Sequence, residues 1–219
     1  MQLVSSLDKS QQTELLESVA ELSKIFWGPD PDSSRDILQG TYLRPFESLK
    51  PIVNYEPPGI IEELRTIHTR FTEENAIFQF LEQAYVRLFI NSREGIAAPL
   101  YASCYVDEKT PGENALLMGS PAVMMKKRFE SRGLSLSDNM HEPPDHLSIE
   151  LEYLYFLLGK GWSDNEGELI AEATSFASDV MLPWVIKLQK RLVAVETECR
   201  FYQLISAILC AILQFIGGL

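Results

Sequence analysis

The chain has 219 residues, and 46% of them are hydrophobic, which is enough to bury the core of one large domain or two small ones. With 31 acidic and 19 basic residues it carries a formal net charge of −12, which disfavours sequence-independent binding to nucleic acid and favours cationic partners. Cys104, Cys199 and Cys210 show no CxxC spacing, so neither a disulfide framework nor a zinc knuckle is indicated. With no secretion signal at the N-terminus, a reducing, cytoplasmic location is expected.

Apolar residues recur at spacings of three and four along the whole chain, and no alternating run between hairpin turns is present. The sequence therefore predicts an all-α fold of about eight to ten helices. In chain order, helices are expected near residues 8–27, 34–39, 60–68, 73–90, 120–132, 145–158, 163–180, 183–198 and 201–219.

Proline and glycine mark the expected breaks between these helices, as in Gly28-Pro29-Asp30-Pro31 and Pro57-Pro58-Gly59. Residues 133–141 form the longest expected linker, and residues 133–144 are interpreted as a hinge-like segment. Repeats and low-complexity tracts are absent. We expect a single domain over residues 1–219, whose two lobes would join near residues 133–141.

The segment from Phe201 to Leu219 is almost long and apolar enough to span a bilayer. Its strongest apolar residues recur at helical spacing, whereas Gln203, Ser206 and Gln214 fall largely on the other side. This pattern predicts a core helix and no stable membrane insertion.

No phosphate-binding loop and no GxSxG nucleophile motif occurs, so no cofactor and no catalytic residue is predicted. His141, Glu142 and His146 superficially resemble the HExxH zinc motif, which requires a continuous helix. Pro143 and Pro144 stand between them, so no metal is expected. A metal-dependent hydrolase using His141, Glu142 and His146 is kept as an alternative function.

The same segment has the features of a helix entrance, at which Asp145 would cap the first turn and His146 would bond to Glu150. Its surroundings are acidic, because residues 141–170 contain seven carboxylates and one cation, Lys160. Aromatic residues also lie in this stretch. An acidic rim beside an apolar groove would suit a peptide with basic and apolar parts, so Asp145 and His146 are either structural caps or direct ligands.

These residues resemble a known family, the redox-enzyme maturation chaperones of the TorD, DmsD and NarJ type. The family segment Glu-Pro-x-Asp-His-Leu is matched from Glu142 to Leu147, with Pro144 at the variable place. Its Tyr-x-x-Leu-Phe and Pro-Pro-Tyr-x-Ser-x-Tyr patterns resemble Tyr85, Leu88, Phe89, Pro99, Tyr101, Ser103 and Tyr105, with Leu100 replacing a proline. A weaker match includes Phe176, Pro183 and Trp184, where Val180 stands at the position of the family's histidine.

The resemblance implies an all-helical, non-enzymatic, cytoplasmic chaperone. Such proteins bind the twin-arginine leader, and often the apo form, of the catalytic subunit of a molybdenum-containing reductase, and they assist cofactor insertion and proofreading. By position, the implied peptide-binding residues are Leu88, Phe89, Pro99, Tyr101, Ser103, Tyr105, Glu142, Pro144, Asp145, His146, Leu147 and Trp184. Two further possibilities stay open: a helix-binding scaffold that uses the C-terminal apolar face, and a monomeric or domain-swapped dimeric state.

Overall fold

The computed structural model describes residues 7–91, 95–106, 118–135 and 141–219. The α-helices are α1 (Lys9–Trp27), α2 (Pro31–Gln39), α3 (Arg44–Leu49), α4 (Ile60–His68), α5 (Glu74–Tyr85), α6 (Ser120–Ser131), α7 (Leu147–Ser163), α8 (Gly167–Ser175), α9 (Leu182–Ala194) and α10 (Phe201–Ile216). Short 3-10 turns are η1 (Thr41–Leu43) and η3 (Ala102–Tyr105), and π-helical turns are η2 (Val86–Ile90) and η4 (Phe176–Met181). No strand occurs in the described ranges, and the predicted all-α fold is confirmed.

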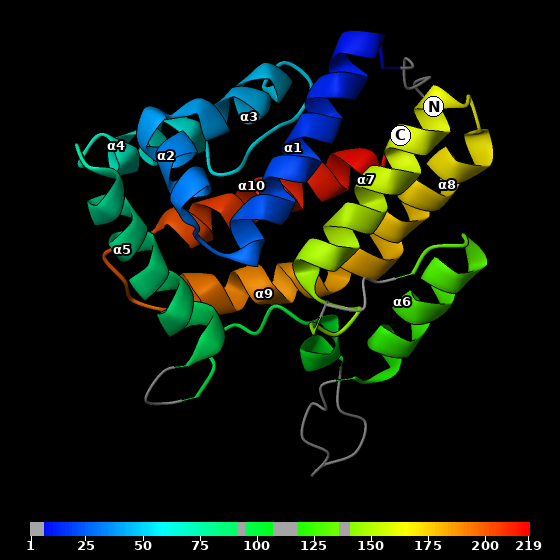
Figure 1. Cartoon of the computed structure of the whole chain (residues 1–219). Coiled ribbons are helices and arrows are strands. Elements are labelled where there is room, and N and C mark those ends of the chain that lie inside the picture. The colour runs from blue at the N-terminus through cyan, green and yellow to red at the C-terminus, as the bar shows by residue number, and fades with distance from the viewer. Residues whose placement is uncertain (1–6, 92–94, 107–117, 136–140) are drawn as a thin grey trace.

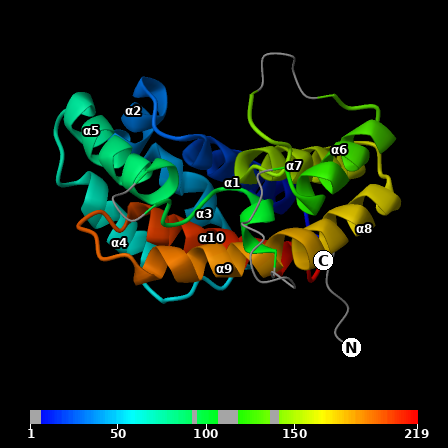
Figure 2. The same cartoon turned by 90° about the horizontal axis from the view of Figure 1, so that it is seen from below.

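The helices fall into two groups that share a common centre (Figures 1 and 2). Helices α2, α4 and α5 lie on one side, and α6, α7 and α8 lie on the other. Helix α1 packs along α7 and against α3, while α9 and α10 pack against each other. Helix α10 contacts α4 and α5 of the first group and also packs on α9 and η4, and buried residues of both groups belong to one continuous core.

Helix α10 forms the centre of this core, and its prediction as a core helix is confirmed. Every residue from Phe201 to Leu213 is buried, including the side predicted to be polar. The polar donors on that side are satisfied internally, since Gln203 donates to the carbonyl of Leu192 at 3.3 Å and Ser206 donates to the carbonyl of Gln203 at 2.8 Å, whereas Oε1 of Gln203 has no hydrogen-bond partner among the described residues. A helix that is apolar nearly all round is typical of such a central position.

The predicted break before Pro183 is wrong, because one continuous helical stretch runs from Gly167 to Ala194. The π-turn η4 lies immediately before α9, and Pro183 occupies the first turn of that helix. A π-turn shifts the hydrogen-bonding register, so the missing N–H of the proline does not end the helix. This stretch is also long and apolar enough to cross a membrane by length and composition alone, but here it packs against α7 and α10.

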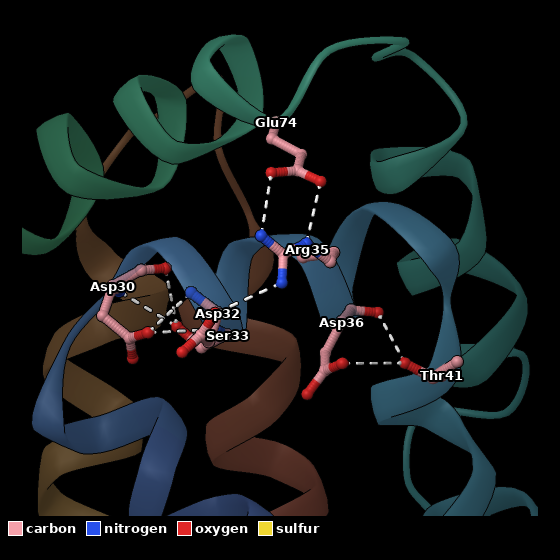
Figure 3. Close-up of polar contacts among 7 residues, drawn as sticks. All are labelled: Asp30, Asp32, Ser33, Arg35, Asp36, Thr41 and Glu74. Atoms are coloured by element: carbon pink, nitrogen blue, oxygen red, sulfur yellow. Dashed lines mark hydrogen bonds and ion pairs between the residues drawn. The ribbon is translucent and has the colours of Figure 1, made fainter.

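Helix α2 begins three residues before the predicted start, at Pro31, because Asp30 caps it (Figure 3). The carboxylate of Asp30 accepts hydrogen bonds from the N–H groups of Asp32 at 2.8 Å and Ser33 at 3.1 Å. Arg35 then joins α2 to α5 through two hydrogen bonds to Glu74, at 2.9 Å and 3.5 Å.

Helix α3 was missed by the sequence prediction, because this short helix has too few apolar residues to show a period.

Helix α6 confirms the helix predicted over residues 120–132. Part of the segment that follows, residues 136–140, lies outside the described ranges. The hinge-like role assigned to residues 133–144 therefore stays a prediction.

Candidate functional site

Backbone hydrogen bonds join the turn before α7 to a second segment, which consists of η3 and the residues just before it. The N–H of Ala102 donates to the carbonyl of Asp145 at 3.0 Å, and the N–H of Leu147 donates to the carbonyl of Leu100 at 2.8 Å. Tyr101 and His146 thereby form an isolated antiparallel bridge. Two sequence motifs that were singled out separately consequently meet at one place in the fold.

Asp145 is fully buried beneath this bridge. Its Oδ2 accepts hydrogen bonds from the backbone N–H of Ser103, at 2.8 Å, and from the hydroxyl of Ser103. Its Oδ1 has no hydrogen-bond partner among the described residues. The expectation that Asp145 caps α7 is wrong: the carboxylate instead holds η3 against the turn.

His146 is the residue that caps α7. Its Nδ1 accepts a hydrogen bond from the N–H of Ser148 at 3.2 Å. The expected side-chain bond to Glu150 is not formed: the Glu150 carboxyl accepts from Trp184, and His146 and Glu150 are joined by a backbone hydrogen bond of 3.0 Å. Only 4% of His146 is exposed, and burial lowers its pKa from the ordinary 6.5 to about 4, against the opposing effect of nearby Glu142 and Asp145. The imidazole is therefore neutral at pH 7.

Five residues form a continuous row of contacts around the imidazole, which we call the acidic–aromatic row: Glu142, Tyr101, His146, Trp27 and Glu152. The Tyr101 hydroxyl donates to Glu142 at 2.5 Å, and its ring meets the imidazole edge-on at a centroid distance of 5.2 Å. On the other side, Trp27 stacks on His146 with centroids 4.8 Å apart and donates from Nε1 to Glu152 at 2.8 Å. A carboxylate thus stands at each end of three aromatic rings.

The outer members of the row reach the surface. Trp27 is 36% exposed, Glu152 is exposed, and Tyr101 and Glu142 are half-buried. Burial and the hydrogen bond to Glu142 raise the pKa of the Tyr101 hydroxyl, which therefore stays protonated and remains a donor. The exposed chemistry of the row is consequently two carboxylates beside aromatic faces.

Several predicted site residues are buried and do not belong to the row. Leu88, Phe89, Leu147 and Pro144 are buried. Phe89 packs edge-on against Phe26, at a centroid distance of 6.3 Å, and against Tyr202, at 5.1 Å. Their role in binding stays a prediction.

The remaining predicted residues lie on the other side of η3. Tyr105 donates to the carbonyl of Pro99 at 2.8 Å and packs against Trp184 with ring centroids 5.5 Å apart. Both rings line a cavity between η3, α6 and the η4–α9 junction. Val180, at the position of the family's histidine, is half-buried at this cavity, and its neighbour Asp179 is exposed and accepts from the Ser178 hydroxyl at 2.8 Å.

No metal centre is formed by the part of the chain that the structure describes, since no three His, Cys, Asp or Glu side chains are grouped there as ligands. His141 is exposed, and the Nδ1 of His146 is already used by the α7 cap. The buried thiols are equally unsuited to nucleophilic chemistry, because burial raises the pKa of Cys199 to about 11 and that of Cys210 to about 12.

Sequence reasoning missed the role of two residues. Trp27 was interpreted only as the end of the first helix, and nothing in its local sequence indicates that it meets His146. Glu150 was counted among surface carboxylates, although it lies three residues after Leu147 and four before Leu154, on the apolar face of α7. A carboxylate on a buried helix face was a detectable signal.

Comparisons with known proteins relate this sequence to a family. The sequence model of the nitrate reductase delta subunit family matches residues 54–189, which is more than half of the chain. Over 158 residues, 71% of this chain and 74% of the relative, the sequence is 27% identical to the chaperone protein TorD of Histophilus somni. It is 29% identical to TorD of Vibrio atlanticus over 172 residues, which are 75% of this chain and 72% of that one.

Among solved structures, a protein from Archaeoglobus fulgidus described as a redox enzyme maturation protein is similar, with a TM-score of 0.47 and 18% identity over 100% of this chain and 98% of that one.

The helical fold, the motif that forms the row and the relatives named as chaperones define a TorD-type maturation chaperone, so the expectation of a non-enzymatic protein is confirmed. The metal-dependent hydrolase alternative is accordingly set aside. The chain belongs to the nitrate reductase delta subunit family.

Proposed function

We propose that this protein is a cytoplasmic chaperone that binds the twin-arginine leader of the catalytic subunit of a molybdenum-containing reductase. It also holds the apo form of that subunit while the cofactor is inserted, and it releases the subunit to export or assembly afterwards. The proposal agrees with membership of the family and with the relatives named TorD chaperones.

The acidic–aromatic row is the observation that carries the proposal. Glu142 and Glu152 present carboxylate oxygens, which accept paired hydrogen bonds from guanidinium groups, and the exposed face of Trp27 can stack against a cation. The net charge of −12 adds a long-range attraction for a basic leader. Asp145 and Ser103 contribute indirectly, because the hydrogen bond between them holds the bridge that places Tyr101 beside His146.

The test is titration of a fluorescent leader peptide that contains Arg-Arg, with a matched peptide in which both arginines are glutamine. Glu142→Gln and Glu152→Gln should each weaken binding of the arginine peptide about tenfold or more, because a hydrogen bond to a charged group contributes about 1.5–3 kcal/mol. Glu168→Gln, which removes the same charge from an exposed position on α8, is the matched control. Equal affinity for the two peptides would overturn the proposal.

Salt provides an independent measurement. Exposed ion pairs are screened over about 8–10 Å at physiological ionic strength, so affinity for the arginine peptide should fall as salt rises. An affinity that does not depend on salt would remove charge pairing from the mechanism.

The scaffold alternative finds no support in the arrangement of α10. That alternative needs an exposed apolar face on the C-terminal helix, and the residues from Phe201 to Leu213 are buried within the chain itself.

A further inference from the structure

A cavity lies apart from the acidic–aromatic row, and no residue of the row lines it. It is a cavity of about 270 Å³ between η3, α6 and the η4–α9 junction, just below the range of about 300–1,000 Å³ for small-molecule pockets. Its apolar walls are formed by Val106, Pro121, Met124, Met125, Pro183 and Trp184. A cavity of this size and polarity is able to take an apolar group.

The wall of this cavity contains an unusual polar group, the carboxyl of Glu150. Glu150 is fully buried, and its Oε2 accepts a hydrogen bond from Nε1 of Trp184 at 3.0 Å. Its Oε1 is buried and has no hydrogen-bond partner among the described residues. An unsatisfied buried polar group destabilises a fold, so a carboxyl held in this state beside a cavity indicates a missing hydrogen-bonding partner.

The charged residues near the cavity make other contacts. Arg128 on α6 approaches Glu172 at 3.7 Å and lies 5.2 Å from the ring centroid of Phe176. Lys187 on α9 donates to the carbonyl of Tyr105 at 3.0 Å. Asp179 is an acidic group at the exposed edge. Neither Arg128 nor Lys187 donates a hydrogen bond to Oε1 of Glu150.

Exposed apolar side chains stand at the cavity entrance. Val106 is 52% exposed and Met124 is 55% exposed, and both line the cavity. Met118 and Val123, next to and on α6, are exposed as well. Flexible methionine side chains adapt to varied partners, so this surface suits an apolar body attached to the group that enters the cavity.

We infer that this cavity binds a guanidinium or amidinium group carried on an apolar body, and that the group donates a hydrogen bond to Oε1 of Glu150. A planar cation of this kind supplies a hydrogen-bond donor to the unpartnered oxygen and balances the charge of the ionised carboxylate, while its apolar part contacts Met124 and Trp184. This inference rests on the proposed function in one respect only: the natural occupant of the cavity would be a side chain of the client peptide.

Binding of such a cation should release a proton. Burial raises the pKa of Glu150 well above its ordinary value, nearby Asp145 raises it further, and the Trp184 hydrogen bond and Arg128 lower it. A cation stabilises the ionised carboxylate, so its binding shifts Glu150 from the protonated to the ionised form. Calorimetry in two buffers of different ionisation enthalpy measures this release directly.

Benzamidine is the probe, and benzamide, its uncharged analogue, is the matched control ligand. The indole N–H resonance of Trp184 reports binding at the cavity, because this group already donates to Glu150. Glu150→Gln should weaken benzamidine binding about tenfold or more and abolish proton release, while Glu168→Gln should leave both unchanged. Benzamide should bind the wild-type protein and Glu150→Gln equally weakly.

Val106→Trp is a second variant, in which a large side chain at an exposed position narrows the entrance without altering the core. It should weaken benzamidine binding even if Glu150→Gln folds poorly. The inference is overturned if benzamidine fails to move the Trp184 resonance, or if benzamide and benzamidine bind with equal affinity. Benzamidine binding without leader binding would reject the proposed function alone, whereas leader binding without benzamidine binding would reject this cavity alone.

Discussion

The indole of Trp27 stacks on the imidazole of His146, with ring centroids 4.8 Å apart and planes inclined by 14°. Trp27 is the last residue of α1, and His146 is the cap of α7, so this stack joins the ends of two helices that are far apart in the sequence. The contact also shields the imidazole from water, and burial is the main cause of its lowered pKa.

Removing the indole should therefore change the titration of His146. In Trp27→Ala we expect the pKa of His146 to rise from about 4 toward its ordinary 6.5, because water reaches the ring. An NMR titration of the imidazole resonances measures this shift. Tyr155→Ala, which removes an exposed aromatic ring elsewhere on α7, should leave the titration unchanged. An unaltered pKa in Trp27→Ala would show that other groups exclude the water.

The lowered pKa of His146 also predicts how the stability of the fold depends on pH. Below pH 6.5 the unfolded chain protonates His146, while the folded protein does not until about pH 4, so the unfolded state binds more protons in this window. The free energy of unfolding should fall by about 3 kcal/mol as pH drops from 6.5 to 4, with little further loss from this group at lower pH.

Chemical denaturation at a series of pH values measures this decline. His146→Asn retains a side-chain acceptor for the N–H of Ser148 but cannot titrate, so its decline in this window should be smaller by the same amount. Equal slopes in the two proteins would assign the acid sensitivity to other groups.

Asp145 and Ser103 should be strongly coupled. Asp145→Ala leaves the N–H and hydroxyl of a buried serine without their acceptor, which should cost about 2 kcal/mol of unfolding free energy. In a double-mutant cycle with Ser103→Ala the two losses should be less than additive. Additive losses would indicate that the carboxylate stabilises the turn independently of Ser103.

The cap of α2 offers a prediction that does not depend on function. Asp30→Ala should lower the free energy of unfolding by about 1 kcal/mol, since two N–H groups lose their acceptor. Asp32→Ala should cost less than about 0.5 kcal/mol, because its contact with Arg35 is highly exposed. Thermal or denaturant unfolding distinguishes the two. Equal losses would contradict the capping role drawn in Figure 3.

The all-helical fold and its central helix could be predicted from the sequence alone. Apolar spacing reports which side of a helix is buried, and the segment from Phe201 to Ile216 is apolar enough to be core in any arrangement. The helix entrance at Pro143 and Pro144 was also detectable, because proline and capping residues act locally. The role of each residue at that entrance was not detectable. It depends on contacts with distant residues, since Asp145 bonds to Ser103 and His146 stacks on Trp27.

The tertiary structure decided the features that depend on long-range contacts. The π-turn before Pro183 keeps one helix continuous where local rules predict an end. The pairing of Tyr101 with His146 and the stacking of Trp27 unite three separate segments into the acidic–aromatic row. Composition and periodicity report neighbours within a few helical turns, whereas the cavity beside Glu150 depends on where α6 and α9 pack.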